Sequence, residues 1–120
     1  MTKVKHYLLL LPIILLALAM TFAGAGKLAG LPELHQSFAM LGLPSWFGYF
    51  IGAAELAAGI GLLIPRLTAL AATGLIPIMI GAAYFHIAFN VPSAAPAIIF
   101  VVLSVYAVFY RKEQAVWYPV

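Results

Sequence analysis

LTALAATGLIPIMIGAAYFHIAFNVPSAAPAIIFVVLSVYAVFY, residues 67–110, is the longest stretch of the chain without a Lys, Arg, Asp or Glu. As one helix it would be about 66 Å long, twice the thickness of the hydrocarbon core of a bilayer. The segment must therefore turn back, and Asn90-Val91-Pro92-Ser93 with Pro96 favours a turn over a helix. This stretch predicts two membrane-spanning helices, over residues 67–89 and 95–111.

Two further spans precede this stretch. Residues 7–26 carry no charged side chain, and residues 46–64 carry a single acid, Glu55. The chain is 66% hydrophobic and 8% charged, whereas soluble domains are about 45–50% apolar and about 25% charged. This composition excludes a water-soluble enzyme domain and a disordered chain. We expect an all-α, integral membrane four-helix bundle in one domain, residues 1–120.

The basic residues predict the orientation in the membrane. With four spans, both termini and the loop after the second span lie on one side, which carries Lys3, Lys5, Arg66, Arg111 and Lys112. The other side carries only Lys27. Cytoplasmic loops are enriched in Lys and Arg, so both termini are expected in the cytoplasm. Basic residues confined to chain ends and loops predict no nucleic-acid partner.

The N-terminal segment has a second interpretation. Lys3 and Lys5, the apolar run that follows and Ala23-Gly24-Ala25 also fit a cleaved secretory signal peptide. The apolar run is longer than the usual signal core, and residues 26–28 continue it without a break. An uncleaved anchor is therefore favoured, and the mass of the intact protein distinguishes the two.

A short helix is expected between the first two spans, over residues 32–41. Proline suits a first helical position and an acid suits a helix N-terminus, as in Pro32-Glu33. Leu34, Phe38 and Leu41 share one side, which leaves a wetter side made by Glu33, His35, Gln36 and Ser37. This pattern is typical of a helix that lies in the outer membrane interface.

Glu55 is the residue most informative about function. A charge at the centre of a membrane helix costs about 2.5–3.5 kcal/mol, so Glu55 should face the protein interior. It shares one helical stripe with glycines and one arginine, namely Gly48, Gly52, Gly59 and Arg66. Glycines let a neighbouring backbone approach closely, and Gly74 and Gly81 suggest a second such face. Glu55 is either an interhelical anchor or a proton, ion or quinone site.

Other polar groups could accompany Glu55. Lys27 closes the first span and either snorkels to the interface or turns inward. Arg66 lies too far along the stripe for a direct bond and suits the cytoplasmic helix end. His86, one turn inside the outer end of the third span, is more often a helix contact than a ligand. One His, one Glu and no Cys make a poor metal set, so no metal site is predicted.

Three sequence elements together resemble a known family. Gly24-Ala-Gly-Lys27-Leu28, Gly42-Leu43-Pro44 and Glu55-Leu-Ala-Ala-Gly59 continuing to Pro65-Arg66 resemble the DoxX and DoxX-like proteins. The resemblance covers roughly residues 8–110 and implies a small four-span protein of the bacterial inner membrane. It also implies that Lys27, Glu55, Arg66 and His86 are the candidate polar core. Some members are membrane subunits of thiosulfate:quinone oxidoreductase, and others tether soluble redox enzymes or assist membrane-protein assembly.

Two functional hypotheses are favoured over a third, that the chain itself oxidises or reduces quinone, because it has no cofactor motif and no cysteine. The first is a non-catalytic accessory subunit or anchor for a soluble or membrane oxidoreductase linked to quinone. It rests on the family resemblance and on the lack of a recognisable set of catalytic residues or a cofactor motif. Quinone is the one cofactor that we consider. The second is a small proton-coupled transporter that uses Glu55. Oligomerisation stays open, because Gly48-x-x-x-Gly52 serves a dimer face and a bundle contact equally well.

Overall fold

The computed structural model describes residues 2–91 and 93–117. This part of the chain is entirely helical apart from its connections. It contains α1 (Thr2–Leu28), α2 (Pro32–Met40), α3 (Ser45–Leu62), α4 (Pro65–Ala88), α5 (Ala95–Arg111) and a single 3₁₀ turn, η1 (Lys112–Gln114). The expected all-α class is confirmed. Pro92, within the predicted turn, lies outside the described residues.

Three helices are long and apolar enough to cross a bilayer. Among the described residues these are Lys3–Leu28, Pro65–Ala88 and Ala95–Gln114. The sequence also predicted a span over residues 46–64, and α3 covers this segment as far as Leu62. Helix α3 is not among the three.

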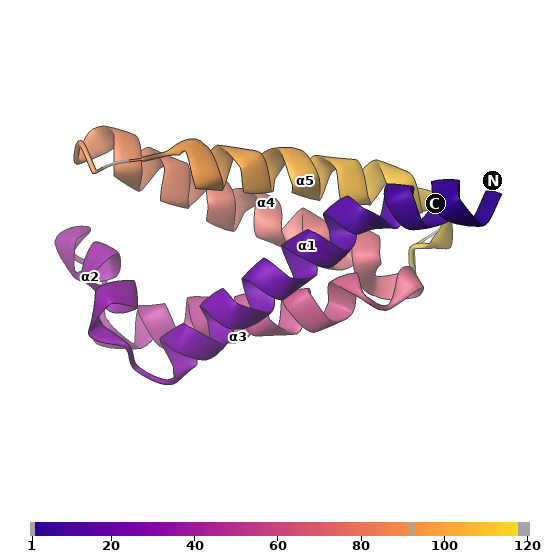
Figure 1. Ribbon diagram of the computed structural model, residues 1–120. Coiled ribbons are helices and arrows are strands. Elements are labelled where there is room, and N and C mark those ends of the chain that lie inside the picture. The colour runs from indigo at the N-terminus through magenta and orange to yellow at the C-terminus, as the bar shows by residue number, and fades with distance from the viewer. Residues whose placement is uncertain (1, 92, 118–120) are drawn as a thin grey trace.

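The four long helices run side by side, with alternating directions (Figure 1). Helix α1 packs chiefly against α3, α4 packs chiefly against α5, and α3 joins the two pairs through α4. The start of α1, the α3–α4 turn and the end of α5 meet at one end of the bundle, which we call the charged end. Helix α2 and the α4–α5 turn lie at the opposite end, which we call the α2 end.

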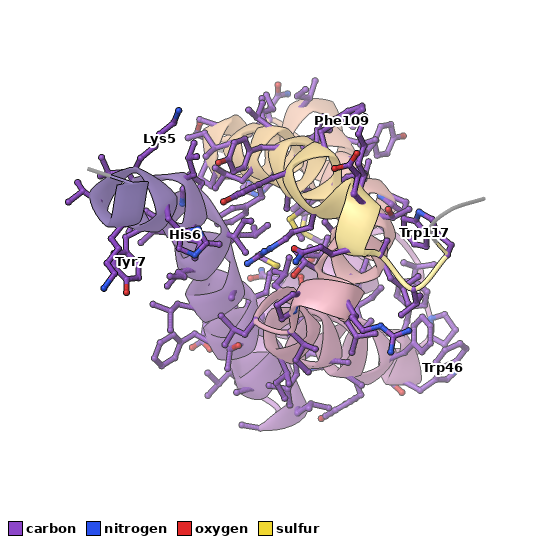
Figure 2. All side chains as sticks on the ribbon, turned by 90° about the vertical axis from the view of Figure 1, so that its right-hand side faces the viewer. Lys5, His6, Tyr7, Trp46, Phe109 and Trp117 are labelled. Carbon is purple, nitrogen blue, oxygen red and sulfur yellow. The ribbon has the colours of Figure 1, made fainter. Side chains whose placement is uncertain are left out.

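The core of the bundle is narrow. It is formed by apolar side chains of the four long helices, among them Leu16 and Met20 of α1, Leu75 and Met79 of α4, and Ala107 of α5. Many large apolar side chains remain exposed, such as Phe22, Ile87 and Val102. Figure 2 looks at the charged end and shows Tyr7, Phe109 and Trp117 directed away from the helices. An apolar exterior of this kind suits lipid, where helices gain nothing by hiding such side chains.

Glycines bring α1 and α3 into backbone contact. A Cβ added to Gly24 would lie 2.6 Å from the Gly52 carbonyl oxygen. A Cβ added to Gly59 would lie 2.8 Å from the Thr21 backbone nitrogen. These distances leave no room for a side chain, so the two helices approach as closely as their backbones allow.

Gly74 and Gly81 do not form the second close-packing face that their spacing suggested. A Cβ added at either position would meet no heavy atom within 4 Å. The reason is that α4 turns these positions towards open grooves and not towards a neighbouring backbone, which helical spacing alone cannot show.

Side-chain and backbone hydrogen bonds hold the charged end together. The Thr68 hydroxyl lies 2.8 Å from the Leu62 carbonyl oxygen across the α3–α4 turn. The Val116 amide donates to the Arg66 carbonyl at 3.1 Å and fixes the segment after α5 onto α4. The Tyr106 hydroxyl of α5 donates to the Leu9 carbonyl of α1. The bundle is therefore closed at the end opposite α2.

Candidate functional site

A cavity of about 880 Å³ opens at the α2 end of the bundle. Helix α2 forms one wall, α4 forms another, and α1 and α3 contribute Lys27, Phe47, Ile51 and Glu55. Most of the lining is apolar, with polar side chains at a few positions. Its size falls within the range of about 300–1,000 Å³ typical of small-molecule sites.

The polar wall of the cavity is an ion pair between Lys27 and Glu55. The ammonium Nζ of Lys27 donates to the carboxylate Oε1 of Glu55 at 2.7 Å. The two side chains are 13% and 4% exposed. In such surroundings each charge depends on the other, because an unpaired buried charge is costly. The structure thus turns Lys27 inward, the second of the two orientations considered from sequence.

The end of α1 sets the position of Lys27. Gly30 takes a left-handed conformation with φ of 82°, which a glycine adopts without strain. The amides of Gly30 and Leu31 then donate to the Lys27 and Gly26 carbonyls, at 3.0 and 3.3 Å. This Schellman arrangement ends the helix just after Lys27. Gly52 completes the placement, since a Cβ there would lie 2.6 Å from Lys27 Cβ.

His35 attaches α2 to the ion-pair region. Its Nε2–H donates to the Lys27 carbonyl at 2.8 Å, and its ring lies 4.5 Å from the Tyr49 ring, centroid to centroid. The imidazole covers Gly48, where a Cβ would collide with the ring. Gly48 therefore makes room for a side chain of α2, whereas Gly52 and Gly59 make room for α1.

Helix α4 supplies the facing wall of the cavity. Pro77, Gly81, Phe85 and His86 line it. The Nδ1–H of His86 donates to the Val91 carbonyl at 3.1 Å, just past the end of α4. Asn90 makes that turn with a φ of 56°, a conformation that Asn tolerates better than most residues. His86 thus fixes the α4–α5 turn and borders the cavity.

The structure brings together three of the four predicted polar-core residues. Lys27, Glu55 and His86 all line the cavity. Arg66 is exposed in the first turn of α4, at the charged end. The helical stripe that linked it to Glu55 breaks at Leu62, where α3 stops before Pro65 begins α4.

Sequence reasoning missed the part that α2 plays. Glu33 and Gln36 are exposed, as expected of the wetter side, and with Ser37, Leu34, Phe38 and Leu41 they also line the cavity. His35, assigned to the same side, is half-buried between α1 and α3. In the sequence, the glycines at the two ends of α2 could have indicated that this helix folds back onto the bundle. Within the described residues, no three His, Asp or Glu side chains gather as a metal site would need.

Residues 12–109 match the DoxX-like family. The chain belongs to the DoxX-like family. Lys27, Glu55 and His86 of this DoxX-like protein, and the whole of its cavity lining, fall within the matched residues. Comparisons with curated proteins and with solved structures gave no match.

Proposed function

We propose that this DoxX-like protein crosses the bacterial inner membrane four times and serves as a non-catalytic subunit that holds a quinone for an oxidoreductase. The observation that carries the proposal is the cavity, in which a buried ion pair faces apolar walls. Quinones combine hydrogen-bonding oxygens with an apolar tail, and such a site offers partners to both.

Helix α3 is the fourth span in this proposal. Its 18 residues extend about 27 Å at the rise of an α-helix, close to the hydrocarbon thickness. It runs antiparallel to α1 between the same two ends of the bundle (Figure 1). Because Glu55 is paired with Lys27, its charge does not face lipid alone.

The distribution of basic residues orients the cavity. Lys3, Lys5, Arg66, Arg111 and Lys112 belong to the charged end. If this end is cytoplasmic, as the positive-inside rule requires, the cavity lies in the outer half of the membrane. An oxidoreductase served by this quinone would then approach from the outer face, next to α2.

The ion pair favours this role over proton-coupled transport. A transporter that uses Glu55 would need the carboxylate to exchange protons or substrate during each cycle. Here Lys27 already balances the carboxylate at 2.7 Å. Proton flux into proteoliposomes that is driven by substrate and abolished in Glu55→Gln would support the transporter instead.

Mild-detergent purification at native expression level tests the proposed role. Mass spectrometry of the intact complex should find the chain with bound quinone and a stoichiometric oxidoreductase. Lys27→Ala should reduce both, whereas Lys112→Ala, an exposed lysine at the opposite end, should leave both unchanged. A wild-type chain that carries neither quinone nor partner would contradict the proposal.

A further inference from the structure

We infer that the cavity selects a neutral amphiphile whose head carries a carbonyl or hydroxyl group, held by Lys27 and Glu55, and that Gly81 provides the room for it. This inference rests on the proposed function and states which head groups the ion pair accepts. It follows from the charges that face the cavity, from their hydrogen-bonding capacity and from the shape of the α4 wall.

The charges that face the cavity exclude a charged head. Lys27 and Glu55 cancel each other, Glu33 of α2 is exposed, so that water compensates its charge, and His86 borders the opposite wall. An anionic head would compete with Glu55 for Lys27 and leave one carboxylate unpaired. A cationic head would compete with Lys27 for Glu55 and leave one cation unpaired. Both would leave an uncompensated charge among apolar side chains, which is costly.

The ion pair keeps hydrogen-bonding capacity for a neutral head. A lysine ammonium has three N–H donors, and Lys27 donates one to Glu55 Oε1. Among the described residues, Glu55 Oε2 has no hydrogen-bond donor. A carbonyl oxygen can therefore accept from Lys27 and a hydroxyl can donate to Glu55, without separating the two charges.

The remaining walls suit an alkyl or isoprenoid chain. Phe47 and Ile51 of α3 and Ile78 and Phe85 of α4 line the cavity. Contact with these side chains removes apolar ligand surface from water, at about 25 cal/mol per Å². A polar head at the ion pair and a chain along these walls match an amphiphile better than a fully polar solute.

Gly81 determines how much of the cavity a ligand can fill. It lines the cavity, and a Cβ added there would meet nothing within 4 Å. A larger side chain would therefore enter the open space and not the packed core. Gly74, on the same helix, is equally open but lines a separate groove of about 260 Å³ between α3 and α4. The two glycines form a matched pair for substitution.

Decyl-chain probes with different heads test the inference on the full chain in nanodiscs. The probes are decylubiquinone and monodecanoylglycerol, both neutral, ionised decanoate, and decyltrimethylammonium. We expect at least one neutral probe to bind about tenfold or more tightly than either charged probe. Comparison of the two neutral probes shows whether the head is a quinone or a glyceride. Equal binding of decanoate or of the ammonium probe would overturn the inference.

Leucine substitutions locate the binding. Gly81→Leu should weaken binding of the neutral probe about tenfold or more, whereas Gly74→Leu should leave it unchanged. Unfolding temperatures of the unliganded variants, measured in parallel, verify that both are folded. If Gly81→Leu is unfolded, Gly81→Ala replaces it with a smaller expected loss. Equal binding by a folded Gly81 variant and the Gly74 variant would overturn the inference.

The two proposals fail in different ways. Selective binding of a neutral probe by a chain that purifies without quinone or partner would support the inference and contradict the redox role. If quinone and an oxidoreductase co-purify with a chain that binds charged probes equally well, the redox role is supported and the inference is contradicted.

Discussion

Lys27 and Glu55 form a buried ion pair. Replacing one partner should destabilise the fold more than replacing both with neutral groups. The Coulomb attraction within a buried pair is largely offset by the free-energy cost of removing the two charges from water. Loss of one partner leaves the other without compensation, whereas joint replacement by neutral groups avoids that penalty. At this position the neighbouring helix supplies the partner, since Lys27 and Glu55 lie on α1 and α3.

We therefore predict strong coupling between these two positions. Glu55→Gln and Lys27→Met should each lower the free energy of unfolding by about 3–5 kcal/mol, as for other broken buried pairs. The double variant should lose clearly less than the sum. Reversible unfolding in detergent, read as a double-mutant cycle, measures the coupling. Strictly additive losses would show that the two charges act independently.

Alanine substitutions at Gly52 and Gly74 should have different effects on the free energy of unfolding. A Cβ on Gly52 would lie 2.6 Å from Lys27 Cβ and 3.1 Å from the Gly24 carbonyl oxygen. Gly52→Ala should therefore force α1 and α3 apart and cost about 1–3 kcal/mol. Gly74→Ala should be neutral or stabilise by up to about 1 kcal/mol, because alanine favours helix. The same unfolding assay applies, and equal effects of the two substitutions would refute the packing argument.

Individual residues were predictable to different degrees. The burial of Glu55 follows from the cost of a charge in lipid, and the structure places this residue at 3% exposure. The same argument could not choose the direction of Lys27, because a long side chain at a helix end can reach either the interface or the interior. Nor could spacing show that Gly74 and Gly81 face open space.

Helix α2 is held at its two ends and at one point along its length. Gly30 and Gly42, with φ of 82° and 77°, bound the segment, and His35 donates from its middle to the Lys27 carbonyl. Loss of one such hydrogen bond costs about 0.5–1.5 kcal/mol. In a short helix with no fully buried residue, this is a large part of what keeps it in place.

We predict that His35→Ala loosens α2 without unfolding the bundle. Amide hydrogen exchange over residues 31–43 should become about three- to tenfold faster, while α4 keeps its protection. His35→Gln, which retains an N–H donor, should restore part of the protection. His6→Ala, an exposed histidine at the charged end, serves as the control. Unchanged exchange in His35→Ala would show that apolar contacts alone fix α2.

The amphipathic pattern of α2 was recognised in the sequence, but its surroundings were not. Leu34 and Phe38 indicate an apolar side, and periodicity reports only that such a side exists. It does not tell whether lipid or another helix covers it. In the structure the helix folds back over α1 and α3, so both its polar and its apolar residues border one cavity.

The four spans that we propose would place α2 and the charged end on opposite sides of the membrane. The chain contains no cysteine, so single cysteines can report each side. Gln36→Cys in α2 should react with a membrane-impermeant maleimide in intact spheroplasts. Lys112→Cys should react only after permeabilisation. The opposite pattern would reverse the orientation, and labelling of both sites from one side would exclude four spans.

The class of this protein and the approximate positions of its helices can be read from the sequence. Long apolar stretches admit only hydrogen-bonded helices in lipid, and a stretch longer than one bilayer must turn back. These constraints are local or depend on length, so they can be read residue by residue. Family membership likewise depends on the order of residues along the chain.

The contacts between the helices, by contrast, are visible only in the folded structure. The Lys27–Glu55 bond joins residues far apart in sequence, and the cavity has walls from four helices. Periodicity defines the face of a helix but not its neighbour, since several packings bury the same glycines and the same acid. The distances between helices and the space left between α2 and α4 follow from packing all of them at once.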